Sequence, residues 1–204
     1  MRGVRTLVLA LVGSALVACG GADPGEQGST DALSATEAQS LVFTREEEKL
    51  ARDVYAALEA KDPMFSNIKS SEQTHMDAVL TLLSRYGLPD PAADNAPGEF
   101  EDATLKKLHD ELVARGAPST LAALQVGVAI EELDIRDIEA ARPSISHADI
   151  VTTYDNLTRG SRNHLRSFYA KVTALGGSYT PQYLDASTFR QIVDSPMETG
   201  GPGR

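Results

Sequence analysis

The sequence has no tryptophan, a single cysteine and few aromatic residues, which make up 5% of the 204 residues. With one cysteine, no intrachain disulfide can form. Long runs of β-branched residues are also missing, whereas alanine, leucine, glutamate, aspartate and arginine recur in long periodic stretches. These absences argue against a β-rich or disulfide-stapled fold and favour an all-α protein.

Basic residues are outnumbered, with 19 against 29 acidic residues and a net charge of -10. Proteins that bind nucleic acid usually carry a basic patch, and so we expect no nucleic-acid partner. An acidic surface is compatible with cation binding, although most exposed carboxylates only keep helix faces solvated. Hydrophobic residues make up 42% of the chain, which is enough for one domain with a proper core.

The first 18 residues have the pattern of a secretory signal, with two arginines, an apolar run from Leu7 to Val17 and small residues after it. The apolar run is too short for a comfortable transmembrane span. Its end, LVAC at residues 16–19, resembles the lipobox of bacterial lipoproteins, in which the cysteine is lipidated and becomes the first mature residue. We therefore expect a lipoprotein signal peptide over residues 1–18 and lipidation of Cys19, with an ordinary signal peptide as the alternative.

The signal also predicts where the protein lies. Secretion across the inner membrane followed by lipidation anchors the protein in the cell envelope through Cys19, and Gly20 after the cysteine favours the outer membrane if the source is Gram-negative. Residues 19–40 are rich in Gly, Ser, Asp and Thr and predict a flexible tether. We expect one folded domain over residues 41–193 and a disordered tail over 194–204. A homo-oligomer is compatible with the sequence, which leaves the oligomeric state open.

Apolar residues spaced three and four apart predict four long amphipathic helices. We expect them over about 41–60, 62–87, 119–141 and 147–175. Gly87 and Gly176 stand where C-capping glycines are common. A connection rich in Pro, Asp and Gly over 88–101 and a short helix over 104–115 separate the second long helix from the third, and another short helix is expected over 187–193. Four long helices with a crossover between the second and third describe a ferritin-like four-helix bundle.

Acidic residues and histidines interrupt the apolar stripes of all four long helices. A carboxylate buried without a partner is unfavourable or becomes protonated, so converging acids and imidazoles need an explanation. Divalent iron or manganese supplies one, because it accepts carboxylate oxygen and imidazole nitrogen ligands. The candidate ligands are Glu47, Glu72, His75, Glu131 and His164, with Asp134 at the edge of its stripe.

Glu72 and His75 are the best-defined part of this set. Their Glu-x-x-His spacing places both side chains on one helical face, as dimetal sites in helical bundles require. A symmetric site would have a second glutamate three residues before His164, but Ser161 stands there and serine is a poor ligand for such metals. A rise of about 1.5 Å per residue also places Glu131 and His164 roughly 9 Å apart in height, and a long turn over 143–146 or a shifted helix would absorb some of this difference.

Each candidate also has an interpretation without metal. These are a capping box between Thr44 and Glu47, an ion pair of Glu131 with Arg162 or Arg166, a hydrogen bond from His164 to a backbone carbonyl, and Asp134 as a surface acid. Glu48 and Glu132 are expected to point away from the stripes of their helices. His109 and His147 lie outside the four stripes, and we assign them no chemistry.

Four motifs make the sequence resemble a known family. They are REEEKLARDVYAAL, FSNIKSSEQTHMDAVLTLLSRYGL, VGVAIEELDIRDIE and YDNLTRGSRNHLRSFYAKVTALGGSYTPQYL. From about Phe43 to Ile192 the chain resembles an uncharacterised prokaryotic ferritin-like domain family, known mainly as a domain of unknown function. The resemblance implies a ferritin-like four-helix bundle and implies no particular activity.

A broader similarity, to rubrerythrin and other ferritin-like di-iron proteins, implies a set of ligands. One acid comes from the first helix, Glu-x-x-His from the second, acids one turn apart from the third and Glu-x-x-His from the fourth. Residue by residue these are Glu47, Glu72 with His75, Glu131 with Asp134, and His164. Ser161 departs from this pattern, and the chain has no Cys-rich rubredoxin-like module.

The combined expectation is an envelope-anchored protein that binds one or two transition-metal ions, with iron first and manganese second. A mononuclear or storage-free metal-binding role fits the sequence equally well. If the site is redox-active, the protein would be a ferritin-like oxidoreductase whose metals react with dioxygen or peroxide. Glu72 and Glu131 would then bridge or chelate the metals, and His75 and His164 would be terminal nitrogen donors. The alternative is a non-enzymatic helical lipoprotein, a binding or structural module whose metal site is degenerate and whose polar core groups form an acid, arginine and histidine network.

Overall fold

The computed structural model describes residues 32–200, and over that range it contains six α-helices and no β-strand. The helices are α1 (Ala35–Leu58), α2 (Met64–Arg85), α3 (Ala103–Gly116), α4 (Thr120–Ala141), α5 (Ala148–Ala174) and α6 (Ala186–Val193). The predicted all-α fold class is therefore confirmed for this part of the chain. The expected signal peptide, the lipidation site at Cys19 and the start of the tether lie outside the described residues. Of the described helices, none is both long and apolar enough to cross a membrane.

The start of α1 differs from the prediction, because the helix begins at Ala35 rather than near Leu41. Ser34 caps it through a capping box. The Ser34 Oγ accepts a hydrogen bond from the Glu37 N–H at 3.2 Å, and the Glu37 carboxylate accepts one from the Ser34 N–H at 3.0 Å. The other helices start and end close to their predicted bounds, and Gly87 adopts the positive φ of 66° that a C-terminal glycine permits.

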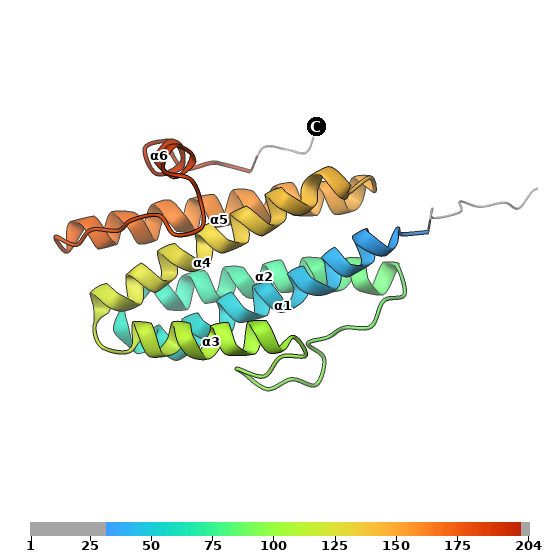
Figure 1. The fold of residues 1–204 in the computed structure, drawn as a ribbon, viewed down its shortest axis with the longest axis horizontal. Helices are drawn as coiled ribbons and strands as arrows, with labels where there is room; N and C mark the ends of the chain where they lie inside the picture. Colours follow the sequence, from blue (N-terminus) through green and yellow to red (C-terminus); the bar gives the residue numbers. More distant parts are fainter. Residues whose placement is uncertain (1–31, 201–204) are drawn as a thin grey trace, which may run out of the picture. The chain divides into compact units, whose positions relative to one another are not determined.

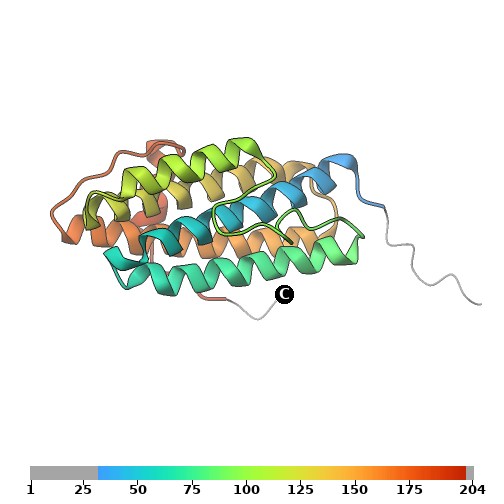
Figure 2. The same ribbon diagram turned by 90° about the horizontal axis from the view of Figure 1, so that it is seen from below.

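The long helices pack in two pairs (Figure 1). α1 packs along α2 and α4 packs along α5, and the two pairs meet where α1 contacts α4 and α2 contacts α5. α3 lies against both α1 and α4, as Figure 2 shows from the side of α3, and α6 packs on α5. The pairs therefore enclose a common interior between α1, α2, α4 and α5.

The connection between α2 and α3, residues 86–102, runs back along α1 and is tied to it by buried polar side chains (Figure 2). Arg45 donates two hydrogen bonds of 2.9 Å to Asp90. Glu46 accepts two backbone N–H groups of the connection, at 2.6 and 3.0 Å, and Lys49 donates to two of its backbone carbonyls at 2.9 Å. The middle of α1 consequently has almost no solvent-facing side, and residues on opposite sides of this helix are buried.

Two apolar clusters fill the interior and leave a polar layer between them. The first cluster is centred on Tyr55, Phe65 and Phe168, whose rings lie 5.3–5.7 Å apart between centroids, and the second contains Leu41 and Tyr154 at the other end of the helices. The polar layer between the clusters consists of Glu47, Glu48, Glu72, His75, Glu131, Asp134, Ser161 and His164. Each of the four long helices therefore presents polar residues to the interior at the same level of the bundle, between the two apolar clusters.

Candidate metal centre

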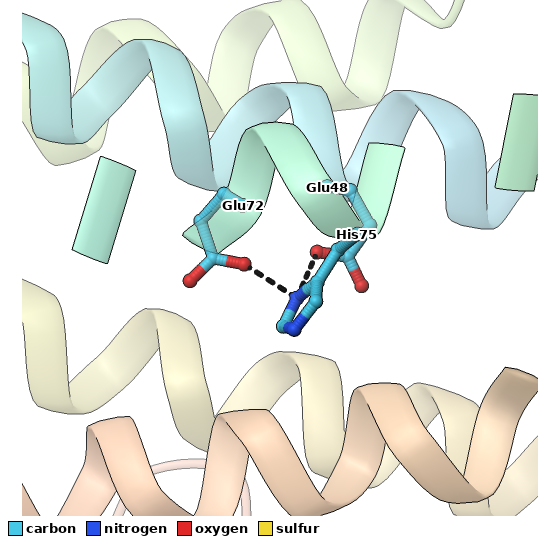
Figure 3. A group of neighbouring side chains, drawn as sticks. All are labelled: Glu48, Glu72 and His75. Atoms are coloured by element: carbon cyan, nitrogen blue, oxygen red, sulfur yellow. Dashed lines mark hydrogen bonds and ion pairs between the residues drawn. The ribbon is translucent and has the colours of Figure 1, made fainter. Parts of the chain in front are cut away.

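One half of the polar layer is formed by Glu48 on α1 with Glu72 and His75 on α2, which we name the His75 group. Figure 3 shows the three side chains pointing toward one another. The Nδ1 atom of His75 lies 3.1 Å from Glu48 Oε2 and 2.7 Å from Glu72 Oε2. Each residue offers a ligand atom within 4.8 Å of the other two, which is close enough for all three to bind one metal ion.

The other half is the His164 group, formed by Glu72, Glu131 on α4 and His164 on α5. The His164 Nδ1 lies 2.9 Å from Glu72 Oε1 and 3.5 Å from Glu131 Oε1, and these ligand atoms also lie within 4.8 Å of one another. Glu72 belongs to both groups and directs a different oxygen toward each imidazole. The layer thus contains two sets of three ligands that share one carboxylate.

Glu48 is the residue that sequence reasoning missed, and the expectation that it points away from its stripe is wrong. That expectation rests on an apolar stripe through Phe43, Leu50, Val54 and Leu58. Phe43 is 37% exposed in the structure, however, and lies outside the core. Leu41, Glu48 and Tyr55 are buried at a spacing of seven residues and mark the face that looks inward. This heptad spacing is the signal that identifies Glu48 in the sequence.

Glu47 is buried in the same layer but belongs to neither group. Position 47 lies well inside α1, so the alternative in which it forms a capping box at a helix start is wrong. Its Oε1 has no hydrogen-bond partner. Burial and the neighbouring carboxylate of Asp137 raise the pKa of Glu47 well above its usual range.

Asp134 is likewise buried, at 1% exposure, so the interpretation as a surface acid is wrong. Both of its carboxylate oxygens lack a hydrogen-bond partner. Burial, followed by the charges of Glu48 and Glu47, raises the pKa of Asp134 well above its usual range. Asp134 therefore lies beside the two groups as a further buried acid that belongs to neither.

Glu131 does not pair with an arginine. Its Oε1 accepts a hydrogen bond of 2.6 Å from the hydroxyl of the fully buried Tyr55. Arg162 and Arg166 instead donate to Glu198, in the segment expected to be a disordered tail, at 2.7–2.8 Å. Nothing in the sequence indicates the contact with Tyr55, because it joins α1 to α4.

The expected difference in height between Glu131 and His164 does not separate the two residues, since their ligand atoms lie 3.5 Å apart. After α4 the chain continues as a 3₁₀ turn over Arg142–Ser144 before α5 begins. A 3₁₀ turn rises about 2 Å per residue, which reduces the mismatch to about 3 Å. The side chains of Glu131 and His164 extend toward each other and span the remaining difference in height.

Ser161 occupies the position that a second Glu-x-x-His motif would give to glutamate. It is fully buried, and its Oγ donates to the carbonyl of Leu157 on the same helix at 3.2 Å. α5 therefore supplies an imidazole to the layer and no carboxylate. Glu72, from the opposite pair of helices, provides the second acid of the His164 group.

The charges of the layer act strongly on one another. Burial alone would lower the pKa of His75, but the carboxylates of Glu48 and Glu72 outweigh it and raise this pKa to about 11. In the same way Glu131 and Glu72 raise the pKa of His164 to about 10. Burial would raise the pKa of Glu72, yet the two imidazoles hold it well below its usual range. The neighbouring carboxylates therefore favour the charged form of both imidazoles.

These features define an all-helical protein with buried carboxylate and imidazole groups that could bind metal. Comparison with known proteins then gives its family: residues 37–196 match the model described as "Uncharacterized protein domain (DUF2202)", and the chain belongs to that family. It is 44% identical over 170 residues to "Uncharacterized protein MJ0754" of Methanocaldococcus jannaschii, which covers 82% of this chain and 92% of that protein. The crystal structure of hypothetical protein MJ0754 from Methanococcus jannaschii is similar, with a TM-score of 0.81 and 42% identity over 85% of this chain and 100% of that chain.

Proposed function

We propose that this chain is a ferritin-like four-helix protein that binds two divalent transition-metal ions in its polar layer, iron first and manganese second. The packing of α1 with α2 and of α4 with α5, joined by the long α2–α3 connection, supports the ferritin-like assignment. The two ligand groups that share Glu72 support two metal positions. A lipid anchor at Cys19 in the cell envelope remains part of the proposal and is supported by the LVAC motif.

The observation that carries the proposal is the state of Glu72. This carboxylate is fully buried, yet neither of its oxygens has a hydrogen bond of normal geometry, although an imidazole nitrogen lies 2.7 or 2.9 Å from each. Glu131 Oε2 and His164 Nδ1 also lack a partner. Buried polar atoms are almost always hydrogen-bonded, so several buried polar atoms without such a partner in one layer are what a cation-binding site would contain. Carboxylate oxygen and imidazole nitrogen are donors that suit iron and manganese, and the residues therefore fit these metals.

The charge of the layer supports two ions rather than one. Five buried acids lie close to two imidazoles, and metal ligation requires the imidazoles to be neutral. With all five acids ionised, two divalent ions would nearly balance the carboxylates, whereas one ion would leave most of that negative charge buried. The acids are Glu47, Glu48, Glu72, Glu131 and Asp134.

The chain's own residues would have distinct roles at such a centre. Glu72 would bridge the two positions, and Glu48 and Glu131 would each complete one of them. His75 and His164 would be terminal nitrogen donors, and the Tyr55 hydroxyl holds Glu131 in orientation. When bound, a pair of iron or manganese ions supplies redox chemistry toward dioxygen or peroxide.

The rival function is a structural or binding module whose layer is neutralised without metal. The two imidazolium ions favour this alternative, because they compensate two of the five carboxylates. Against it, Arg162 and Arg166 are engaged with Glu198, so the expected network of acids, arginines and histidines does not form around Glu131. Three carboxyls then remain without a cation in the layer, and a metal-free module would have to keep them protonated, as the raised pKa values of Glu47 and Asp134 permit.

Metal content separates the two functions. The full-length chain, purified and reconstituted without oxygen with Fe²⁺ or Mn²⁺, should contain about two equivalents by elemental analysis. Glu72→Gln should lose both, because Glu72 belongs to both groups. The matched control is Glu132→Gln, a buried acid next to Glu131 whose carboxylate accepts hydrogen bonds from Tyr179 and the backbone.

Two results would count against the proposal in different ways. Wild-type protein with less than about a tenth of an equivalent after reconstitution would favour the metal-free module. A Glu72→Gln variant with the full metal content would overturn the assignment of ligands and leave metal binding intact.

A further inference from the structure

Gly160 on α5 lies directly against the imidazole of His75. A Cβ atom built on Gly160 would lie 2.6 Å from the Nε2 and 2.8 Å from the Cε1 of that ring. Real Cβ atoms essentially never approach another heavy atom within 3.0 Å. Only a residue without a side chain therefore leaves the ring of His75 in its present place.

The ring is held from its other sides as well. Its Nδ1 lies 3.1 Å from Glu48 Oε2 and 2.7 Å from Glu72 Oε2, and its face stacks on the ring of His164 with centroids 5.8 Å apart. The α5 backbone at Gly160 thus closes the remaining side. A ring displaced by a methyl group at this position has to move its Nδ1 relative to the two carboxylates.

No backbone requirement explains a glycine at this position. Gly160 lies in the middle of α5, and it is not among the glycines with positive φ. Alanine is a better helix former than glycine in a helix interior, because glycine loses more conformational freedom on folding. The close approach of His75 is the contact that an alanine would disturb.

We infer that Gly160 is a positioning residue, which keeps the imidazole of His75 aligned with Glu48 and Glu72 so that the three can act as one ligand group. The inference rests on the proposed function in one respect, namely that His75 binds metal. Gly160 has no side chain with which to bind metal and acts only through the ring of His75, against which it lies.

The test is Gly160→Ala in the full-length chain. The contacted atoms are at the far end of a side chain, so we expect the helical circular-dichroism signal to be retained, while the melting temperature falls modestly because the ring moves away from the buried carboxylates of Glu48 and Glu72. Metal titration should show one position weakened by at least about tenfold, as expected for a displaced ligand, with the other position retained.

The matched control is Gly116→Ala. A Cβ at Gly116 would lie 2.6 Å from the Leu58 Cδ1, so the steric conflict is as severe, but Leu58 lies about 15 Å along α1 from Glu48. We expect this variant to lose stability and to keep the metal stoichiometry and both affinities of the wild type.

A double-mutant cycle shows whether Gly160 acts through His75. In a His75→Ala background, the Gly160→Ala change should have no further effect on metal affinity. An equal loss of affinity in both backgrounds, or wild-type affinity in Gly160→Ala alone, would overturn the inference.

A measurement without metal keeps this inference separate from the proposed function. The imidazole ¹H–¹⁵N signals of His75 in metal-free protein should shift in Gly160→Ala and stay in place in Gly116→Ala. If the wild type bound no metal, the proposed function would fail while this shift could still be observed. Unchanged signals in Gly160→Ala would show that the ring does not depend on the glycine.

Discussion

His75 and His164 stack their imidazole rings with centroids 5.8 Å apart and planes at 28°, although they come from α2 and α5. Both rings direct Nδ1 toward the same carboxylate, that of Glu72. Around this stack, the α1–α2 pair supplies two acids and one imidazole, whereas the α4–α5 pair supplies Glu131 and one imidazole. The asymmetry makes Glu72 the residue on which both groups depend.

The first prediction decides between Glu47 and Glu48 as the ligand from α1. Glu48→Gln should weaken or remove metal at the His75 group, because the Glu48 carboxylate lies 3.1 Å from His75 Nδ1. Glu47→Gln should keep both metal ions, since Glu47 belongs to neither group. Elemental analysis of the two variants, prepared in parallel, measures the difference. Loss of metal from Glu47→Gln alone would restore the assignment made from the apolar stripe.

The second prediction concerns the hydrogen bond from Tyr55 to Glu131. Tyr55→Phe keeps the buried ring and removes the 2.6 Å hydrogen bond, so unfolding should become easier by about 1 kcal/mol. Metal affinity at the His164 group should fall about 10- to 100-fold, as is typical when the hydrogen-bond partner of a ligand is lost.

The control for this prediction is Tyr154→Phe. The hydroxyl of Tyr154 is bonded to Ser40 at 2.7 Å and to Thr44 at 3.2 Å, and neither of these residues belongs to a ligand group. Urea unfolding and metal titration of both variants should show a similar loss of stability and a loss of affinity only in Tyr55→Phe. Equal affinities in the two variants would contradict a role for Tyr55 at the metal centre.

Helical periodicity predicts most of this fold, because each long helix has one wide apolar face. It fails in α1, where the α2–α3 connection covers the side that would otherwise face solvent. Burial on opposite sides of a helix removes the contrast on which an apolar stripe depends. Phe43, the first residue of the predicted stripe, is one of the few large hydrophobic residues left exposed among the described residues.

The candidate site is predictable where its spacing is local and unpredictable where it depends on contacts between helices. Glu72 and His75 lie three residues apart on one helix, and this spacing alone places them together. The approach of Glu131 to His164 depends on the 3₁₀ turn after α4, whose rise a count of α-helical residues does not include.

The third prediction concerns the pH dependence of a contact we call the Glu37 clamp, in which Glu37 joins the start of α1 to residues 146 and 147 before α5. The Glu37 carboxylate accepts hydrogen bonds from the backbone of Ser146 at 2.8 Å and from Ser34 at 3.0 Å, and His147 Nδ1 lies 2.8 Å from it. Burial alone would raise the pKa of Glu37, but bonds from His147, Ser146 and Ser34 hold it well below the ordinary 4.5. A depressed carboxyl pKa stabilises the fold above the unfolded value, and this contribution is lost as pH falls through the folded value.

Glu37→Gln should therefore cost about 1 to 3 kcal/mol of unfolding free energy near neutral pH. The difference between variant and wild type should narrow as the pH falls below 4.5. Urea unfolding at a series of pH values measures it, with the exposed Glu139→Gln as the control that should show little difference at any pH. A difference that did not change with pH would show that the lost contacts, and not the charge, stabilise the clamp.

The last prediction concerns Asp134. It lies among the other acids of the layer, and neither of its carboxylate oxygens has a hydrogen-bond partner. Burial and the charges of Glu48, Glu47, Glu131 and Glu72 raise its pKa well above the ordinary 3.8. A carboxyl whose pKa is raised on folding favours the folded state below the unfolded value, and this advantage is lost as pH rises through the folded value. Asp134→Asn removes the charge and adds an N–H donor for the neighbouring carboxylates. The metal-free variant should be more stable than the wild type by about 1 to 3 kcal/mol at about pH 8 and similar to it near pH 4.

Metal reverses this comparison if the layer binds cations. A ligand that binds only the folded state stabilises it according to concentration and affinity, and a divalent ion gains from every carboxylate around it. With Mn²⁺ added, the wild type should therefore gain more stability than Asp134→Asn, and the advantage of the variant should shrink or disappear. Urea unfolding with a chelator and with Mn²⁺ measures both states. If the difference in unfolding free energy between variant and wild type were the same with and without metal, Asp134 would not interact with a bound cation. That result would favour a layer that is neutralised by protons alone.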